Sequence, residues 1–215
     1  ASDVYKRQIL LGALALSACT DDAVDSKEIT EEVLPIPLNL TQEQKEEYYQ
    51  EYVAVLDKVN AEDSGDFELE LETITQFLDD NWIEVDDFEK LAKERANASI
   101  IFLKNKERYN PMSVPKVVKL QIGSKEANIN FEGSFDTQLN ENTPKGRQLF
   151  SLFNGISSEA EDSNINWNQY GNVTLLKDDG ATYLIEVSGN YSQYGIISTH
   201  TIPLEFYCDK NGGIS

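Results

Sequence analysis

Few side chains in this sequence have the chemistry that catalysis needs. The chain of 215 residues contains one histidine, His200, and two cysteines, Cys19 and Cys208. His200 lies in the run Ser198–Thr201 between two strand-like segments, and a catalytic histidine needs a nucleophile or an orienting carboxylate within reach. A lone histidine in a Thr-rich strand is more often structural, so a hydrolase centred on His200 is the minor alternative. The sequence also contains no Gly-rich phosphate loop, G-x-S-x-G or H-E-x-x-H motif. We therefore expect a protein that is not an enzyme.

Two short segments, Trp167–Asn172 and Tyr191–Ile196, share an aromatic-x-Gln-Tyr-Gly core. Aromatic rings beside amide side chains suit a sugar or small ligand, because the ring stacks and the amide forms hydrogen bonds. Aromatic packing over a glycine within a sheet explains the same pattern without a ligand and is the favoured interpretation. A ligand site would require its aromatic rings to lie together, exposed on one face. Its residues would be Trp167, Gln169, Tyr170, Tyr191, Gln193 and Tyr194.

Acidic clusters raise the question of a metal site. The segment Asp162–Trp167 has oxygen ligands at alternate positions, but Trp167 and Val173 stand where an EF-hand loop needs Gly and Glu. The pairs Asp79-Asp80 and Asp86-Asp87 could share a cation, but helix caps and solvated faces explain them more simply. One histidine and two cysteines exclude most zinc sites. We expect no metal and no cofactor.

The charge of the chain is strongly negative and unevenly distributed. It has 38 acidic and 18 basic residues, a formal net charge of −20. Nucleic acid is not an expected partner, because phosphate binding needs clusters of Lys and Arg. Residues 20–100 contain 24 acidic and 6 basic residues, whereas residues 101–215 contain 13 and 10. The acidity therefore belongs to the N-terminal part, where it predicts solvated helices rather than a cation site.

Residues 1–19 have the features of a cleaved export signal. Two basic residues precede the apolar run Ile9–Leu16, which is far shorter than the roughly 20 residues of a membrane span. The next residues, Leu16-Ser17-Ala18-Cys19, resemble the lipobox of bacterial lipoproteins: an apolar residue, a small residue, Gly/Ala/Ser and then Cys. The resemblance implies that Cys19 carries a thioether-linked diacylglycerol, which anchors the chain to a membrane. Residues 1–8 look like translated sequencing-adapter sequence; if they are not native, the apolar run and the lipobox are unaffected.

Five further segments carry a second resemblance: Glu46–Tyr49, Asp80–Glu84, Arg95–Ala98, Glu205–Cys208 and Asn211–Gly213. Through them the remainder of the chain resembles a group of small, uncharacterised secreted lipoproteins of bacillus-type Gram-positive bacteria. The resemblance implies anchoring to the outer face of the cytoplasmic membrane and supplies no activity; a Gram-negative source would mean the periplasm or outer membrane. We expect an extracytoplasmic binding or interaction module whose partner is a protein or a glycan.

The elements that would position these residues follow from composition and periodicity. Residues 20–40 are acidic, contain two prolines and predict an extended tether, and residues 41–215 predict a single domain. Within it, 41–110 is mainly helical. A helix begins at Thr41, which with Gln44 fits a capping box, and ends near Asn60. A short acidic strand is expected at 67–72 and a second helix, capped by Asp86 or Asp87, follows.

Residues 111–215 predict mainly strands. Alternating apolar residues indicate one hairpin over 118–133 and another over 173–187, with two further strands at 191–198 and 201–207. Residues 144–156 suggest a short helix. Cys208 ends the last strand and is expected to be a buried thiol, with an intermolecular disulfide as the minor alternative. The fold class is α+β: N-terminal helices followed by an antiparallel β-sandwich or an open-barrel-like sheet of five to seven strands.

Overall fold

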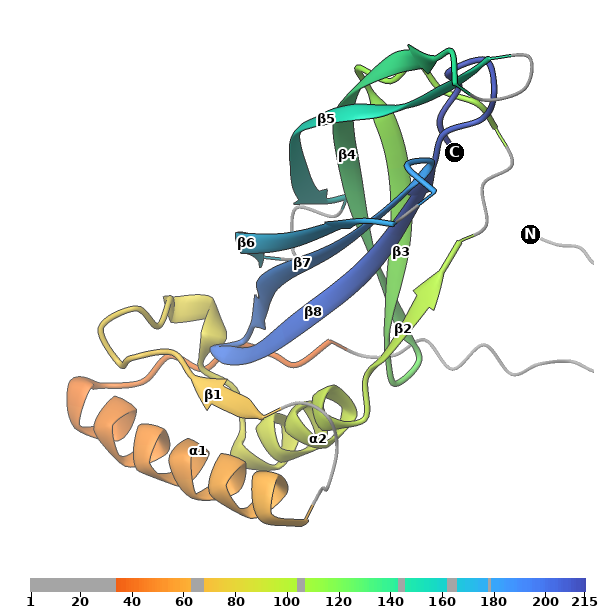
Figure 1. Cartoon of the computed structure of the whole chain (residues 1–215). Helices are drawn as coiled ribbons and strands as arrows, with labels where there is room; N and C mark the ends of the chain where they lie inside the picture. Colours follow the sequence, from red (N-terminus) through yellow and green to blue (C-terminus); the bar gives the residue numbers. More distant parts are fainter. Residues whose placement is uncertain (1–33, 63–67, 104–106, 143–145, 162–165, 178) are drawn as a thin grey trace, which may run out of the picture. The chain divides into compact units, whose positions relative to one another are not determined.

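The chain is mostly β. The computed structural model describes residues 34–62, 68–103, 107–142, 146–161, 166–177 and 179–215. These residues form two α-helices and eight strands, and the strands make two antiparallel sheets of four strands each (Figure 1). Residues 35–215 belong to one compact unit. Residues 111–215, where five to seven strands were expected, contain six of these eight strands.

The first helix, α1 (Gln42–Glu62), begins at the predicted capping box. The amide of Thr41 donates to the side-chain oxygen of Gln44, and the amide of Gln44 donates to the hydroxyl of Thr41, so two amides of the first turn are satisfied reciprocally. The second helix, α2 (Val85–Ala96), is capped differently from our prediction. Its N-cap position is Glu84, and Asp86 and Asp87 lie in the first turn, where carboxylates interact favourably with the helix dipole.

Both helices pack against the short strand β1 (Leu69–Leu71), and the 3₁₀ turn η1 (Asp79–Asn81) lies between β1 and α2 in the chain (Figure 1). The ring of Tyr52 stacks on Phe88 with centroids 3.9 Å apart. The Tyr52 hydroxyl donates to the carbonyl of Ile83 and accepts from its amide. This helical core therefore has its one buried hydroxyl satisfied. Its buried members are Tyr52, Val55, Leu56, Val59, Leu69, Trp82, Ile83, Phe88, Ala92, Ala96 and Ile196.

The first sheet has the order β1-β8-β7-β6. It contains β6 (Asn166–Leu176), β7 (Thr182–Gln193) and β8 (Ile196–Tyr207). The predicted hairpin over 173–187 is confirmed as part of β6 and β7. The two strands predicted at 191–198 and 201–207 are wrong in their boundary, because Tyr194 and Gly195 form the turn between β7 and β8, and β8 runs unbroken from Ile196.

The second sheet has the order β2-β3-β4-β5. Its strands are β2 (Ser99–Phe102), β3 (Val114–Ile122), β4 (Lys125–Asn140) and β5 (Arg147–Ala160). The predicted hairpin over 118–133 is confirmed by the pairing of β3 with β4. The helix suggested within 144–156 is wrong: from Arg147 onward this segment is strand β5, paired with β4.

A main core draws apolar residues from both sheets. Phe135 of β4 and Phe206 of β8 are fully buried, and their ring centroids lie 4.9 Å apart. The large members of this core include Leu120, Ile122, Ile129, Phe131, Phe135, Phe150, Trp167, Ile185, Tyr191, Ile202, Leu204, Phe206 and Ile214.

Candidate binding surface

The two copies of the aromatic repeat face each other across the β6–β7 ladder. Trp167 of β6 is directly opposite Tyr191 of β7. Both rings belong to the main core: Trp167 is 9% exposed and Tyr191 2%. A ring buried to this extent cannot stack on a ligand in solvent.

Trp167 and Gln169 join β6 to β5. The indole lies against Gly189, where an added Cβ would come within 2.4 Å of the ring. Its Nε1 donates to the hydroxyl of Ser158 at 2.8 Å, Ser158 donates to Gln169, and the Gln169 amide donates to the carbonyl of Ile156 at 3.0 Å. This chain of hydrogen bonds satisfies the indole and the amide inside the protein, as the packing interpretation of the repeat predicts.

The aromatic side chains of the second copy of the repeat, Tyr191 and Tyr194, also make contacts within the protein. The Tyr191 hydroxyl donates to Gln193 at 3.3 Å. Tyr194 has φ of 52° in the β7–β8 turn and packs against the helical core. Of the four rings, Tyr170 alone is largely exposed, at 58%. A ligand site built on the repeat requires the four aromatic rings to lie together on one exposed face, and they do not.

His200 lies in a buried polar cluster between α2 and the first sheet. Its Nε2 is hydrogen bonded to the hydroxyl of Ser198 at 2.8 Å. Arg95 of α2 reaches the same hydroxyl and the carbonyl of Tyr191, each at 3.3 Å, and its guanidinium lies 3.7 Å from the centre of the Tyr191 ring. A Ser–His hydrogen bond of this length is found in nucleophile–base pairs, but Ser198 is 0% exposed and His200 1%, so this pair is closed to a substrate in solvent.

The cluster contains a buried cation, the guanidinium of Arg95. Burial lowers the pKa of Arg95 to about 10. Burial, and secondarily the charge of Arg95, lowers the pKa of His200 to about 4, which keeps the imidazole neutral at pH 7. Among the described residues no carboxylate forms an ion pair with Arg95, and its Nε has no hydrogen-bond acceptor. The cluster thus places an uncompensated cation beside the histidine.

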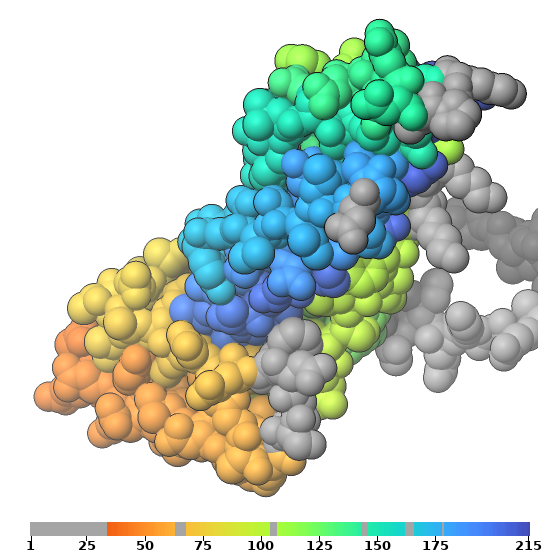
Figure 2. All heavy atoms as spheres, viewed as in Figure 1, coloured from red at the N-terminus to blue at the C-terminus, as the bar shows by residue number. Residues whose placement is uncertain are grey.

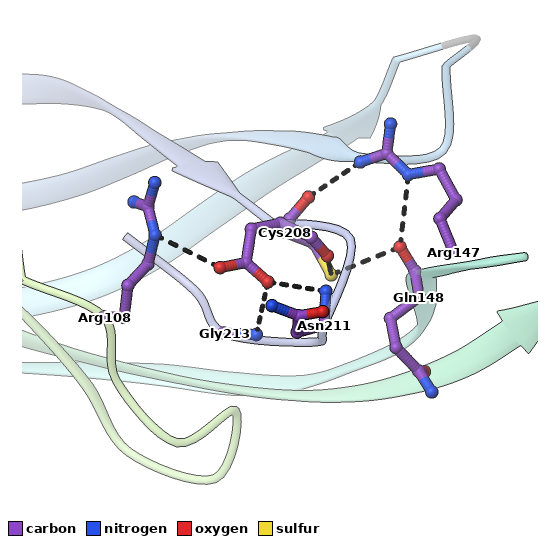
Figure 3. Close-up of polar contacts among 7 residues, drawn as sticks. Arg108, Arg147, Gln148, Cys208, Asn211 and Gly213 are labelled. Carbon is purple, nitrogen blue, oxygen red and sulfur yellow. Dashed lines mark hydrogen bonds and ion pairs between the residues drawn. The ribbon is translucent and has the colours of Figure 1, made fainter. Parts of the chain in front are cut away.

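Cys208 is a fully buried thiol, as predicted, and it lies in a network of hydrogen bonds just after the end of β8 (Figure 3). Its Sγ lies 3.6 Å from the carbonyl of Gln148, and Arg147 donates to the carbonyl of Cys208 at 2.9 Å. Next to it, the Asp209 carboxylate accepts the amides of Asn211 and Gly213. Burial raises the pKa of the thiol, so it is a poor nucleophile in the folded chain.

The other sequence-based candidates lie elsewhere. Asp79 forms an ion pair with Lys45 at 2.8 Å, which accounts for one of the acidic pairs. No group of three or more His, Cys, Asp or Glu side chains within the described ranges is arranged to hold a metal ion. Cys19, the tether up to residue 33 and residues 162–165 of the calcium candidate lie outside the described residues. In the part of the chain that the structure describes, no helix is both long and apolar enough to cross a membrane.

The exposure of the second half of β6, an apolar segment, was not predicted from the sequence. Every residue from Asn172 to Leu176 is exposed. Val173 is 68% and Leu175 60% exposed, and both lie on the sheet face that carries Glu186, opposite Val173. Figure 2 shows β6 as a light-blue band at the surface. The signal in the sequence was a run of eleven residues, Asn166–Leu176, without a single charge.

The two long edge strands differ in how their outer edges are covered. On β5, the amide of Gln148 donates to the carbonyl of Lys210, and the amide of Phe150 donates to the carbonyl of Gly180. For the second half of β6, the described residues provide backbone partners on the β7 side only. An uncovered strand edge presents unpaired amides and carbonyls, which can pair with another extended chain. This half of β6 is the candidate binding surface.

Comparison with known proteins gave no match to a family model, to a curated protein or to a solved structure.

Proposed function

We propose that this chain is a lipid-anchored extracytoplasmic binding module, without catalytic activity, that engages an extended polypeptide through the edge of β6. The observation that carries the proposal is the exposed, uncharged second half of β6 with Val173 and Leu175 on it. Main-chain hydrogen bonds to such an edge supply affinity, and side chains on alternate positions supply selectivity. We take the fold to be an α+β sandwich, in which the helices cover the opposite edge of the β6-containing sheet.

The alternative of a glycan site on the aromatic repeat has less support. Three of its four rings are buried or partly buried, and the polar atoms of Trp167 and Tyr191 form hydrogen bonds within the protein. The hydrolase alternative has less support as well, because Ser198 and His200 are closed to solvent.

The binding edge can be tested in cells that produce the full chain. A photoreactive benzoyl-phenylalanine in place of Leu175 should form covalent adducts with a polypeptide when irradiated. The matched control places it at Thr201, an exposed position on β8, an inner strand. Adducts at neither position, or equally at both, would contradict a binding role for β6.

The anchor is tested separately through Cys19. A Cys19→Ala variant should lose labelling by a fatty-acid analogue and should leave the membrane fraction, because the proposed thioether has no other site. Cys208→Ala is the matched control, since that thiol is buried, and it should keep both label and location. Unchanged fractionation and labelling of Cys19→Ala would refute the anchor.

A further inference from the structure

The lack of charge on β6 restricts what can bind it. The chain carries a net charge of −20, so two copies repel each other, most strongly through their acidic N-terminal parts. Each of the other strands longer than four residues contains at least one Lys, Arg, Asp or Glu, whereas β6 contains none. An uncharged edge offers no attraction to a cationic partner, but it is a surface on which two copies can meet without like charges in contact.

The placement of the acidic residues supports the same conclusion. Residues 20–100 contain 24 acidic and 6 basic residues, and the two helices of this region pack on β1. In the order β1-β8-β7-β6, β1 and β6 are the two outer strands of the sheet. Two copies that join through β6 therefore keep their acidic helices at the far ends of the combined sheet.

The backbone of β6 fixes a register for such pairing. The turn after β6 closes with a hydrogen bond from the amide of Lys177 to the carbonyl of Thr182. Along an antiparallel strand, residues alternately direct their backbone groups toward one neighbour and the other. Counting back from Lys177 along the register of β6 with β7, the backbone groups that point away from β7 belong to Asn172, Thr174 and Leu176.

We propose that β6 of a second copy of this chain pairs antiparallel with β6 across a two-fold axis at Thr174. In this register Thr174 faces Thr174 of the second copy, and Asn172 faces Leu176. Each outward-pointing backbone amide then faces an outward-pointing carbonyl of the other copy, which allows up to about six hydrogen bonds between the chains. On the outer face, Val173 of each copy packs beside Leu175 of the other, a favourable cross-strand pair. The inference rests on the proposed function, because it names the occupant of the β6 edge.

The lipid anchor explains how a short contact would be sufficient. Pairing over five residues is a small interface, and such interfaces are weak between proteins free in solution. Two chains anchored in one membrane are confined to a thin layer, which raises their effective concentration for each other. The association is therefore expected in the membrane at protein levels where free chains stay monomeric.

A cysteine at the two-fold axis tests the register directly. Membranes from cells that produce full-length Thr174→Cys should yield, on mild oxidation, a reducible product of twice the chain mass, because facing Cα atoms in such a pair lie within disulfide range. Thr201→Cys is the matched control, exposed on β8. The wild-type chain, oxidised in the same way, shows how much of the product comes from Cys19 or the buried Cys208. A Thr174→Cys product no stronger than that of Thr201→Cys overturns the proposal.

A charge exchange at Thr174 tests the contact without new disulfides. Thr174→Lys and Thr174→Glu each place like charges opposite each other, so two differently tagged copies of either variant should co-purify from membranes about fivefold less than wild type. Copies of the two variants produced together should recover wild-type co-purification, because opposite charges then face each other. Recovery also demonstrates that both variants fold. Failure of the mixed pair to exceed either single variant overturns the register.

The outcomes separate this inference from the function on which it rests. Photo-adducts at Leu175 whose mass equals twice that of the chain support both the binding edge and a second copy as its occupant. Adducts with a different polypeptide, without the Thr174→Cys product, overturn the second copy as occupant while the binding edge stands. Absence of adducts at Leu175 overturns both.

Discussion

The buried histidine should make the stability of this protein depend on pH in a way that one substitution removes. His200 is 1% exposed and is hydrogen bonded through Nε2 to Ser198 at 2.8 Å. The substitution His200→Gln retains an amide that can reach Ser198 and does not titrate. The difference between the two proteins across the pH range therefore isolates the imidazole.

The direction and size of the change in stability follow from the shift of the His200 pKa, from 6.5 to about 4 in the folded chain. Between these two values the unfolded chain binds a proton that the folded chain does not, so the free energy of unfolding decreases as the pH falls from 6.5 to 4. Below pH 4 both states are protonated and the loss is complete. A shift of this size corresponds to about 3 kcal/mol of stability lost between pH 7 and pH 4.

The measurement is urea denaturation of wild type and His200→Gln at several pH values. Carboxylates titrate in both proteins, so the quantity compared is the difference between their free energies of unfolding at each pH. Wild type should lose about 3 kcal/mol more than the variant between pH 7 and pH 4. Parallel curves for the two proteins would refute the assignment of a buried, neutral imidazole.

Arg95 provides an independent measurement of the same coupling. Its charge is the second cause, after burial, of the low pKa of His200. Arg95→Met keeps the apolar packing and removes the cation, so the pKa of His200 should rise. Because His200 is the only histidine in the chain, its imidazole signal can be followed by NMR without assignment. An unchanged pKa in Arg95→Met would place the cause of the shift in burial alone.

Two further predictions concern packing. Gly189→Ala would bring a Cβ within 2.4 Å of the Trp167 ring and should lower the free energy of unfolding by about 1–3 kcal/mol. Gly171→Ala is the control: this glycine has open space around it, so the free energy of unfolding should change by less than about 0.5 kcal/mol. Equal effects of the two substitutions in urea denaturation would contradict the packing of Trp167 on Gly189. In a Cys19→Ala background, a thiol reagent should label Cys208 only as the protein unfolds, because the thiol is fully buried; rapid labelling under native conditions would show that the site opens locally.

The sequence predicted those elements whose signals are local. The capping box at Thr41 and Gln44 and the two hairpins depend on residues close together in the chain, and each was found. β5 was mistaken for a helix for a specific physical reason. Thr137 pairs with Phe150 and Asp136 with Leu152, so Ser151 is an extra residue in the strand. Such a bulge reverses the alternation.

Because of that bulge, and of a second one at Asn154, apolar positions in β5 do not follow a period of two. Phe150 and Phe153 both approach Phe135, at 5.0 and 5.6 Å between ring centroids. A spacing of three residues between buried aromatics is the spacing of a helix face. A bulged strand and a short helix are therefore indistinguishable in this segment until the partner strand is known.

The turn at Tyr194 and Gly195 was missed for a different reason. Both residues have positive φ, 52° and 76°, which is the geometry of a two-residue type I′ hairpin turn. Asn-Gly or Asp-Gly usually signals such a turn, and a tyrosine at positive φ is uncommon. Packing of the partly buried Tyr194 against the helical core offsets the backbone strain, and this contact is not visible in the local sequence.

The candidate binding edge depends on topology rather than on any motif. An uncharged strand such as β6 is unremarkable in the middle of a sheet, where both edges are paired. It becomes an exposed edge here because β7 and β8 follow it on one side, while β5 continues into the other sheet and has its own edge covered by Lys210 and Gly180. Of the strands in the described ranges, β6 is the one longer than four residues that contains no charged residue, so a second acidic chain can approach this edge without like charges in contact.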